Sequence, residues 1–383
     1  MTRSSNQGSA DVVIVGGGIA GIATAYYLGR AGVKSIVIDR DGIGGHASGY
    51  AYGGLSPLAG AGIPGPMFSM AKKSFDKHME LAESLPEETG CDFEFRARPA
   101  VNLAFTEKEA LQIAEGLEWK NQQKSFSARW MDPDELSSVD PRIAPEALGA
   151  ELVQGMAEVE PRKFVTALCA GAEKMGVSVR RGTAVGLVRS GDKVVGVELQ
   201  DGNIACETVV LAQGPWIGES SSWLGVDVGV TPLKGQILRL ETAQPRLDCT
   251  FAWSGNYATT KADGLLWVGT TEEPVGFDET PTADAAQAIL AGLRKMLPSV
   301  EGKVVKHTAC LRPMSRDGCV LLGAIDAAEG VYIATGGGRK GILYGPGMGS
   351  TLADLITTGT SDLDMTRYDP GRSASVASPQ EPR

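Results

Sequence analysis

Asp11-Val-Val-Ile-Val-Gly16-Gly17-Gly18-Ile19-Ala20-Gly21 is the stretch that decides the fold. A run of β-branched residues, typical of a buried strand, ends at glycines spaced G-x-G-x-x-G, and a helix-like apolar pattern follows. In such a stretch Gly16 permits the tight turn, Gly18 lets a pyrophosphate approach the backbone, and Gly21 lets helix and strand pack closely. The free N–H groups at the start of the helix attract phosphates. The pattern predicts a dinucleotide-binding strand–turn–helix unit.

A second apolar run, Ile36-Val-Ile, ends in Asp39-Arg40. An acid at the tip of the second strand can accept hydrogen bonds from both ribose hydroxyls, and it would repel a 2′-phosphate. The order of strand, glycines, helix, strand and acid therefore indicates a dinucleotide other than NADP. It does not by itself separate FAD from NAD.

Length and composition favour an enzyme of two domains. The chain has 383 residues, with 43% hydrophobic and 21% charged residues, as in soluble globular proteins. A net charge of −10 disfavours nucleic acid and anionic membrane surfaces as partners. We expect no integral membrane segment, because no apolar run reaches eighteen residues. Six cysteines without a C-x-x-C pair and three scattered histidines predict a cytoplasmic protein with reduced thiols and no metal site.

The local patterns predict a set of elements along the chain. Helices are expected over residues 67–89, 106–120, 161–175, 283–297 and 347–358, with a further short helix capped by Asp132. Buried strands are expected over 207–212 and 330–335, a hairpin over 184–199, and antiparallel strands at 236–241, 257–260 and 265–270. The glycine-rich residues 42–66 form either a backbone wall against a flat ring system or a flexible lid.

Five motifs in order resemble the D-amino-acid oxidase family, in particular its glycine oxidase, D-amino-acid dehydrogenase and sarcosine oxidase types. They are the N-terminal fingerprint, Val209-Val-Leu-Ala-Gln-Gly-Pro-Trp-Ile217, Thr231-Pro-Leu-Lys-Gly-Gln-Ile-Leu-Arg-Leu240, Leu311-Arg-Pro-Met-Ser-Arg-Asp-Gly318 and the glycine-rich segment 336–350. The resemblance implies an α/β fold, with a Rossmann-type FAD-binding domain of the glutathione-reductase kind. It also implies an α+β substrate domain with an antiparallel sheet.

The resemblance further implies how the chain is divided and where FAD binds. The FAD-binding domain is expected to comprise residues 1–92, 151–230 and 305–370, the substrate domain 93–150 and 231–304, and the disordered tail 371–383. The expected FAD contacts are Gly16, Gly18, Ile19, Ala20, Gly21, Asp39, Arg40, Ala47, Ser48, Gly53, Gly54, Leu55, Val185, Ala212, Gly214, Trp216, Gly337, Gly338, Lys340, Gly341 and Ile342.

Three residues are candidates for the catalytic site. In the resembling oxidases an arginine at the position of Arg312 binds the substrate carboxylate, and the alternative is an ion pair with Asp317. Tyr257 falls where glycine oxidases carry a tyrosine that contacts the same carboxylate, and the alternative is an ordinary aromatic on a sheet face. Arg339 either contacts substrate or flavin, or faces solvent beside Lys340.

The cofactor chemistry suggests two further expectations. A helix that starts near Gly347 would direct its N-terminal dipole toward the flavin C2=O and N1. Cys310 aligns with the cysteine that sarcosine oxidases link to flavin, although we favour non-covalent FAD as in glycine oxidases. No general base stands out, and hydride transfer from a neutral amine needs none.

The resemblance predicts an FAD enzyme that oxidises the C–N bond of glycine, a D-amino acid or an N-alkyl glycine. A hydride passes to flavin N5, and the imine hydrolyses to a 2-oxo acid. The electron acceptor is O2 or a quinone-type carrier, and a homo-oligomer is compatible with the sequence. The alternatives are a dehydrogenase of secondary amines such as proline, and a flavoprotein subunit of a heteromeric dehydrogenase. D-amino-acid dehydrogenases also leave open peripheral association with the inner membrane.

Overall fold

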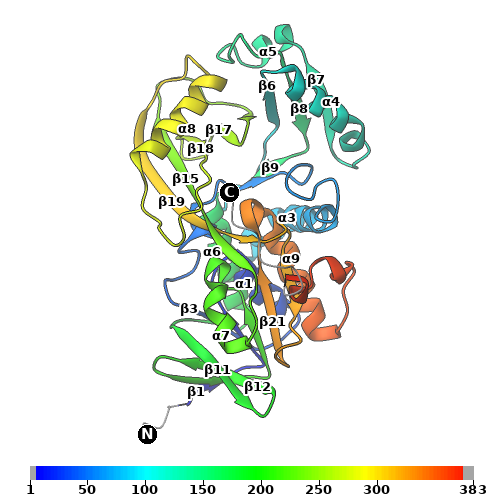
Figure 1. The fold of residues 1–383 in the computed structure, drawn as a ribbon, viewed down its shortest axis with the longest axis vertical. Helices are drawn as coiled ribbons and strands as arrows, with labels where there is room; N and C mark the ends of the chain where they lie inside the picture. Colours follow the sequence, from blue (N-terminus) through cyan, green and yellow to red (C-terminus); the bar gives the residue numbers. More distant parts are fainter. Residues whose placement is uncertain (1–5, 374–383) are drawn as a thin grey trace, which may run out of the picture.

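The computed structural model describes residues 6–373 and consists of four sheets with helices between and around them (Figure 1). The lower half of Figure 1 contains the sheet built around the N-terminal strand, and the upper half contains the largest sheet. Within residues 6–373, no helix combines the length and the apolar character needed to cross a membrane. The same residues contain no group of His, Cys, Asp and Glu side chains arranged to hold a metal ion.

The central sheet of the lower half has six strands, and the five strands from β10 to β21 are parallel. In spatial order they are β10 (Ser178–Arg181), β3 (Ser35–Asp39), β2 (Val12–Val15), β14 (Thr208–Leu211), β21 (Val331–Thr335) and the antiparallel β20 (Leu321–Ala324). All four residues of β2 are buried, and alternate residues face different cores. Val12 and Ile14 pack toward the helices, whereas Val13 and Val15 pack toward the second sheet.

A layer of helices covers one face of this sheet. The helices α1 (Ile19–Arg30) and α9 (Gly341–Thr358) contact its strands, α6 (Pro161–Lys174) packs on α1, and α3 (Phe68–Thr89) packs on α9. The opposite face is covered by a four-stranded sheet of β1 (Asn6–Ser9), β13 (Gly202–Ala205), β12 (Lys193–Leu199) and β11 (Ala184–Ser190). The strand β11 and the strand β12 form the hairpin that the sequence predicts.

The largest sheet has eight strands, in the order β19 (Lys303–Ser315), β15 (Val230–Glu241), β18 (Leu266–Gly269), β17 (Asn256–Thr260), β16 (Thr250–Trp253), β6 (Ala100–Ala104), β8 (Gly149–Gln154) and β7 (Ser127–Met131). Its neighbouring strands are antiparallel except for β16 and β6, which are parallel. These two strands come from distant parts of the chain, so no hairpin dictates their direction. The α/β fold with a mainly antiparallel second sheet is confirmed.

The remaining elements connect these layers. A small sheet contains β4 (Gly54–Leu55), β9 (Ala157–Glu158) and β5 (Arg96–Ala97). The other helices are α2 (Ala47–Tyr50), α4 (Glu107–Asn121), α5 (Pro133–Val139), α7 (Ser221–Leu224) and α8 (Ala283–Met296). Short 3-10 turns are η1 (Gly214–Ser220), η2 (Gly338–Lys340), η3 (Met365–Arg367) and η4 (Pro370–Ser373). Capping boxes at Thr106 and Asp132 fix the starts of α4 and α5, as the sequence predicts for Asp132.

Two predicted boundaries differ from the structure. The C-terminal helix begins at Gly341, six residues before the predicted start near Gly347, because the glycines and Pro346 inside it weaken the helical signal of the sequence. The predicted disordered tail begins at residue 371, but Arg372 donates to the Asp317 carboxylate and to the Cys319 carbonyl. Residues 374–383 lie outside the described residues. The division into two domains remains a prediction, and its boundary at residue 150 falls inside β8.

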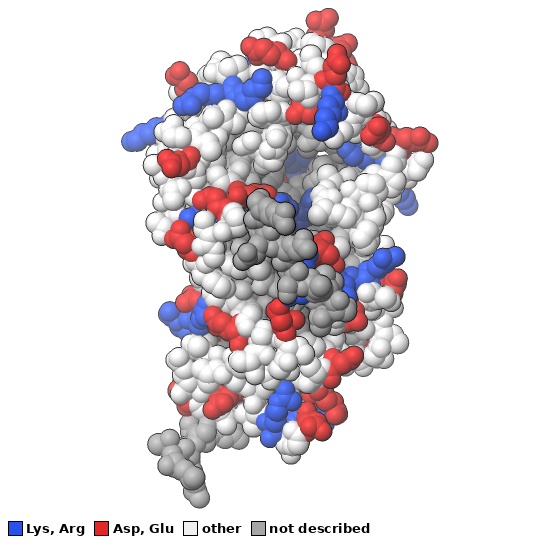
Figure 2. All heavy atoms as spheres, viewed as in Figure 1, with Lys and Arg blue, Asp and Glu red and all other residues white. Residues whose placement is uncertain are grey.

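Acidic and basic side chains alternate over the face shown in Figure 2, without a continuous basic surface among the described residues. This distribution agrees with the net charge of −10. It gives no electrostatic footprint for nucleic acid on that face.

Candidate active site

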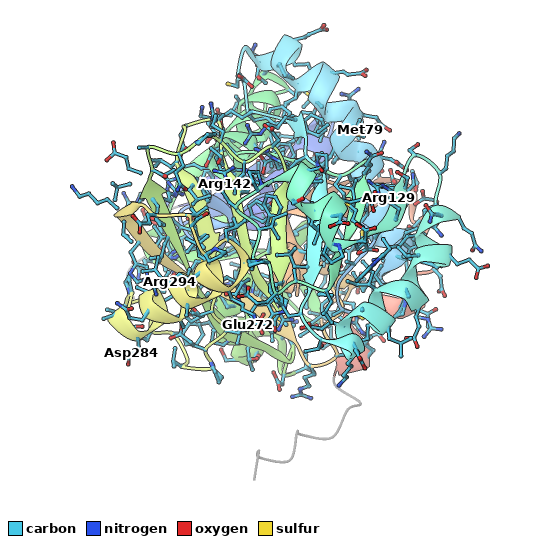
Figure 3. All side chains as sticks on the ribbon, turned by 90° about the horizontal axis from the view of Figure 1, so that it is seen from above. Met79, Arg129, Arg142, Glu272, Asp284 and Arg294 are labelled. Atoms are coloured by element: carbon cyan, nitrogen blue, oxygen red, sulfur yellow. The ribbon has the colours of Figure 1, made fainter. Side chains whose placement is uncertain are left out.

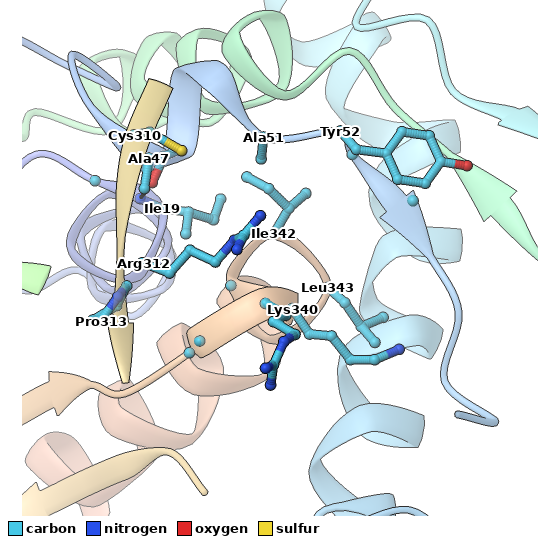
Figure 4. Close-up of a pocket in the computed structure, with 18 of the residues that line it drawn as sticks. Ile19, Ala47, Ala51, Tyr52, Cys310, Arg312, Pro313, Lys340, Ile342 and Leu343 are labelled. Atoms are coloured by element: carbon cyan, nitrogen blue, oxygen red, sulfur yellow. Dashed lines mark hydrogen bonds between the residues drawn. The ribbon is translucent and has the colours of Figure 1, made fainter. Parts of the chain in front are cut away.

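A cavity of about 920 Å³ runs between the carboxyl ends of β2 and β3 and the large sheet. Its volume lies in the upper part of the range of about 300 to 1,000 Å³ that small-molecule sites occupy. One end is lined by the glycine turn after β2, and the other by residues of β17 and β19. Figure 4 shows part of the wall, where Ile342 at the start of α9 lies beside the Arg312 side chain of β19.

The glycine turn has no room for side chains. Gly16 has a φ of +115°, and a Cβ there would lie 2.3 Å from the Ala212 carbonyl oxygen. A Cβ on Gly21 would lie 2.0 Å from the Gly16 carbonyl oxygen, so this glycine allows α1 to approach β2. At Gly18 the nearest atom to a Cβ is the Ser48 hydroxyl at 3.3 Å. No side chain of the turn itself therefore keeps a phosphate from the backbone at the start of α1, where the Ile19 N–H donates to the Ser48 hydroxyl at 3.0 Å.

Asp39 stabilises this turn through its carboxylate. One oxygen accepts the N–H of Gly17 at 2.7 Å, and the other accepts the N–H groups of Asp41 and Gly42 at 2.8 and 2.7 Å. Each carboxylate oxygen has two lone pairs, so one acceptor position, on Oδ2, is left for a ribose hydroxyl. The side chain thus shapes the turn in addition to its predicted contact with ribose.

Most of the residues predicted to contact FAD line the cavity. They are Gly16, Gly18, Ile19, Ala20, Asp39, Arg40, Ala47, Ser48, Gly53, Gly54, Leu55, Ala212, Gly214, Trp216, Gly337, Gly338, Lys340, Gly341 and Ile342. Gly21 lies behind the wall and acts through helix packing. Val185 points away from the cavity with a side chain that is 42% exposed, and its neighbour Ala184 lines the wall instead. Successive strand residues face opposite sides, so the side chains of Ala184 and Val185 point in different directions, and the contact of Val185 with FAD stays a prediction.

The glycines of α9 serve packing, and the helix presents a different N-terminus from the predicted one. Gly341, Ile342 and Leu343 line the cavity, so the positive end of the helix dipole faces it from there. A Cβ on Gly345 would lie 2.2 Å from a side-chain carbon of Ile19, and one on Gly349 would lie 2.4 Å from the backbone of Ala23. These glycines let α9 and α1 pack closely.

Arg312 and Tyr257 meet at the end of the cavity formed by the large sheet. The guanidinium donates to the Thr271 carbonyl at 3.0 Å and to the Thr270 hydroxyl at 2.7 Å. It forms no ion pair with an acid among residues 6–373, and the alternative partner Asp317 pairs with Arg372. The buried hydroxyl of Tyr257 has no hydrogen-bond partner in the same range. Burial raises the pKa of this phenol well above its usual value, so it is a neutral donor.

Two glycines lie so close to Arg312 and Tyr257 that a Cβ on either would collide with one of these side chains. A Cβ on Gly235 would lie 2.1 Å from Nη2 of Arg312, and one on Gly269 would lie 2.7 Å from the Tyr257 hydroxyl. The Tyr257 ring also stacks on Tyr52, with centroids 4.4 Å apart and an angle of 21° between the planes. Sequence reasoning missed the contribution of Thr270 and Gly269, whereas Gly235 stood in one of the motifs.

Arg339 is placed differently from Arg312. It forms a two-pronged ion pair with Glu272, in which both side chains line the cavity and remain about half exposed. Glu272 lies near the centre of Figure 3, on the segment that leaves β18. The hydrogen bonds from Arg339 lower the pKa of this carboxyl. Arg339 therefore lines the cavity as one half of an ion pair, and its contact with substrate or flavin stays a prediction.

The other candidate groups in the wall have structural partners. Lys340 donates to the Ser56 carbonyl at 2.6 Å, and burial lowers its pKa to about 8. His46 lies between the carboxylates of Asp41 and Glu279, at 2.9 and 3.2 Å. Burial raises the pKa of the Cys310 thiol to about 11, so it is protonated at neutral pH and a poor nucleophile.

These features fit a flavin dinucleotide. The glycines from Gly16 to Gly18 leave space for a phosphate beside the backbone. The glycine-rich wall extends from there to Arg312 and Tyr257, the two groups suited to bind a carboxylate. The cavity at the Arg312 end lies beside the start of α9, where the helix dipole would stabilise negative charge on a bound ring. A small anionic substrate therefore has a place at the end of the cavity opposite to the phosphate site.

Comparisons with known proteins agree with this geometry. The family described as FAD dependent oxidoreductase matches residues 11–355. Glycine oxidase of Pseudomonas putida is 33% identical over 367 residues, covering 94% of this chain and 98% of that protein. The hydrogen cyanide synthase subunit HcnC of Pseudomonas aeruginosa is 29% identical, covering 94% of this chain and 95% of that protein. The crystal structure of glycine oxidase from Geobacillus kaustophilus superimposes with a TM-score of 0.90 at 26% identity, over 95% of this chain and 99% of that one. The chain therefore belongs to the family of FAD-dependent oxidoreductases and uses FAD to oxidise an amine or amino acid.

Proposed function

We propose that this chain oxidises the C–N bond of a small amino acid, with Arg312 as the group that binds the substrate carboxylate. The observation that supports this most directly is a cavity-lining guanidinium held by two neutral oxygens, with no acid paired to it among the described residues. Arginine has five N–H donors, so three remain for a ligand after these two bonds. A carboxylate matches that planar donor set in a two-pronged geometry.

Tyr257 adds a second contact in this proposal. Its neutral hydroxyl, which has no partner in residues 6–373, would donate to the same carboxylate. Two directional contacts fix the orientation of a small substrate far better than one, and orientation is the main contribution of the protein in such reactions. FAD, when bound, accepts at its N5 the hydride that leaves the substrate carbon. The resulting imine then hydrolyses to a 2-oxo acid and ammonia or an amine.

The glycine oxidase relatives support glycine or a similarly small amino acid as substrate. The 33% identity to the Pseudomonas putida enzyme extends over nearly the whole of both chains. A D-amino acid and an N-alkyl glycine share the carboxylate that Arg312 would bind. The reduced cofactor would pass its electrons to O2 or to a quinone-type acceptor.

A second candidate function is a flavoprotein subunit of a heteromeric dehydrogenase. The similarity to the hydrogen cyanide synthase subunit favours this candidate, because that protein is named as a subunit. A dehydrogenase of secondary amines such as proline is the third possibility that the same carboxylate site would serve.

The test is anaerobic mixing of the purified flavoprotein with glycine, sarcosine, proline and each D-amino acid, followed through the visible flavin absorbance. Bleaching by one of these compounds supports the proposal and identifies the substrate. Readmission of air then separates an oxidase, whose colour returns quickly, from a dehydrogenase. A yellow protein that none of them bleaches would refute the amino-acid substrate and favour the subunit function.

A further inference from the structure

The guanidinium of Arg312 is attached to the sheet by a short chain of hydrogen bonds. Arg312 Nη2 donates to the Thr270 hydroxyl at 2.7 Å, and this hydroxyl donates to the Gln236 carbonyl at 3.0 Å, which is nearer than its other carbonyl neighbour, Thr271, at 3.4 Å. A hydroxyl has one proton to donate, so the bond to Gln236 turns its lone pairs toward Nη2. The direction of the hydroxyl is therefore set by the backbone of β15 and not by the guanidinium.

The backbone that directs this hydroxyl is itself well fixed. Gln236 is fully buried, and its N–H donates to the Thr271 hydroxyl at 3.1 Å. Its side-chain amide donates to Glu273 at 2.8 Å and accepts the N–H of Thr282 at 2.9 Å. The segment after β18 is thus bonded to β15 at several points around Thr270, which leaves the hydroxyl little freedom.

Both acceptors of Arg312 are uncharged, and this has a chemical consequence. A carboxylate in their place would neutralise the guanidinium and compete with any carboxylate ligand, as Glu272 does at Arg339. A hydroxyl and a carbonyl instead fix the plane of the guanidinium and leave its charge available. This arrangement orients the guanidinium and leaves its remaining N–H groups available to a ligand.

We propose that Thr270 is a positioning residue, whose hydroxyl holds the Arg312 guanidinium in the plane that receives the substrate carboxylate. This inference rests on the proposed function. It assigns to Thr270 no contact with substrate, because the hydroxyl acts through Arg312.

The experiment compares the wild-type flavoprotein with T270V, T270A and T270S, and with T308V as the matched control. Thr308 lies on β19 of the same sheet, and within residues 6–373 its hydroxyl bonds only to the Ile237 carbonyl, at 3.5 Å. Acetate is titrated into each protein as an unreactive carboxylate, and the shift of the flavin absorbance gives Kd. Anaerobic reduction is then measured with the amino acid that bleaches the wild type and with the carboxamide of that amino acid.

We expect T270V and T270A to weaken acetate binding about ten- to hundredfold, the range of a hydrogen bond to a charged group. T270S and T308V should remain within about threefold of wild type, on the same scale. The preference for the amino acid over its carboxamide should fall in T270V and T270A, whereas a general structural defect would slow both compounds equally. Flavin content and melting temperature identify any variant that fails to fold. If T270V or T270A fails to fold, the other of the two, which also lacks the hydroxyl, provides the test.

Two results would overturn the inference, and they can be told apart. If the wild type binds acetate and T270V or T270A binds it equally well, Thr270 does not position Arg312 and the proposed function stands. If the wild type neither binds acetate nor is bleached by any amino acid, the proposed function fails and the inference fails with it.

Discussion

Replacement of Gly235 by alanine tests directly whether the placement of Arg312 matters. The new methyl group would lie 2.1 Å from Nη2, 2.3 Å from Cζ and 2.6 Å from Nη1 of Arg312. Carbon atoms in ordinary contact are about 3.5 Å apart, so the guanidinium must move by about 1 Å or more. The guanidinium ends a long flexible side chain, so it can give way while β15 stays in place. The variant therefore displaces one functional group and leaves the fold intact.

The expected loss follows from that displacement. A shift of about 1 Å in a group that orients the substrate costs on the order of 100-fold in rate. The free energy of unfolding should change by less than about 1 kcal/mol, because alanine in a strand removes the entropic cost of glycine and the clash is with a movable side chain. We therefore expect kcat/KM for the reducing amino acid to fall about 100-fold, with FAD content and melting temperature near those of the wild type.

The assay is steady-state and anaerobic reduction of G235A beside the control G218A. A Cβ on Gly218 would meet no atom within 4 Å, so this control introduces the same methyl group into open space. Wild-type kcat/KM in G235A would refute the reasoning, since the guanidinium would then have moved without consequence. Loss of FAD in G235A but not in G218A would also contradict it, because the glycine would then serve packing.

Four further substitutions test substrate binding, helix packing and the pH dependence of stability. R312A should lower kcat/KM by at least about 100-fold, whereas R339A should lower it by less than about tenfold, because Arg339 has an acid partner and Arg312 has none among residues 6–373. Equal losses in steady-state assays would contradict this. G349A places a methyl group 2.4 Å from a backbone atom of α1, so it should lower the free energy of unfolding by about 1 to 3 kcal/mol, as measured by urea titration. A free energy of unfolding equal to that of the wild type would contradict close packing of the two helices. His78 is fully buried and burial lowers its pKa to about 4, so the unfolded chain binds more protons between pH 4 and about 6.5. The free energy of unfolding should therefore fall by about 2 kcal/mol from pH 7 to pH 5, and in H78Q this part of the fall should vanish; an identical pH dependence in H78Q would exclude His78 as its source.

The sequence predicted the nucleotide half of the fold well because each element there has its own local signal. The β-branched run of β2, the glycines that follow it and the amphipathic pattern of α6 are all readable without tertiary information. The start of α9 was not readable, because Gly345, Gly347 and Gly349 look like a loop until the helices packed against them are seen. Gly345 and Gly349 pack on α1, and Gly347 packs on α3. The parallel pairing of β16 with β6 likewise joins residues about 150 positions apart, which no local pattern encodes.

In the candidate site the sequence likewise predicted which residue types carry the chemistry, but not which residues they contact. Motifs identified Arg312, Tyr257 and Arg339 as residue types suited to an amino acid substrate, but not the atoms beside them. Thr270 carries no signal of its own, since a threonine after a buried strand is common and its role depends on a strand more than thirty residues earlier. Glu272 was missed for the same reason, because its pairing with Arg339 exists only in three dimensions.

The partners, and not the arginines themselves, decide where a carboxylate binds in this cavity. A carboxylate that arrives at Arg339 must displace Glu272, so one ion pair is exchanged for another and little free energy is gained. At Arg312 the incoming carboxylate displaces no acid among the described residues, and it would form two new charge-assisted hydrogen bonds in a partly buried site. The neutral acceptors on Thr270 and Thr271 therefore leave the guanidinium without a directly bonded acid, although Arg312 is close enough to Glu272 to help lower the pKa of that carboxyl. A variant that introduces an acid there, T270D, should pair with Arg312 and abolish acetate binding while the wild-type fold is kept.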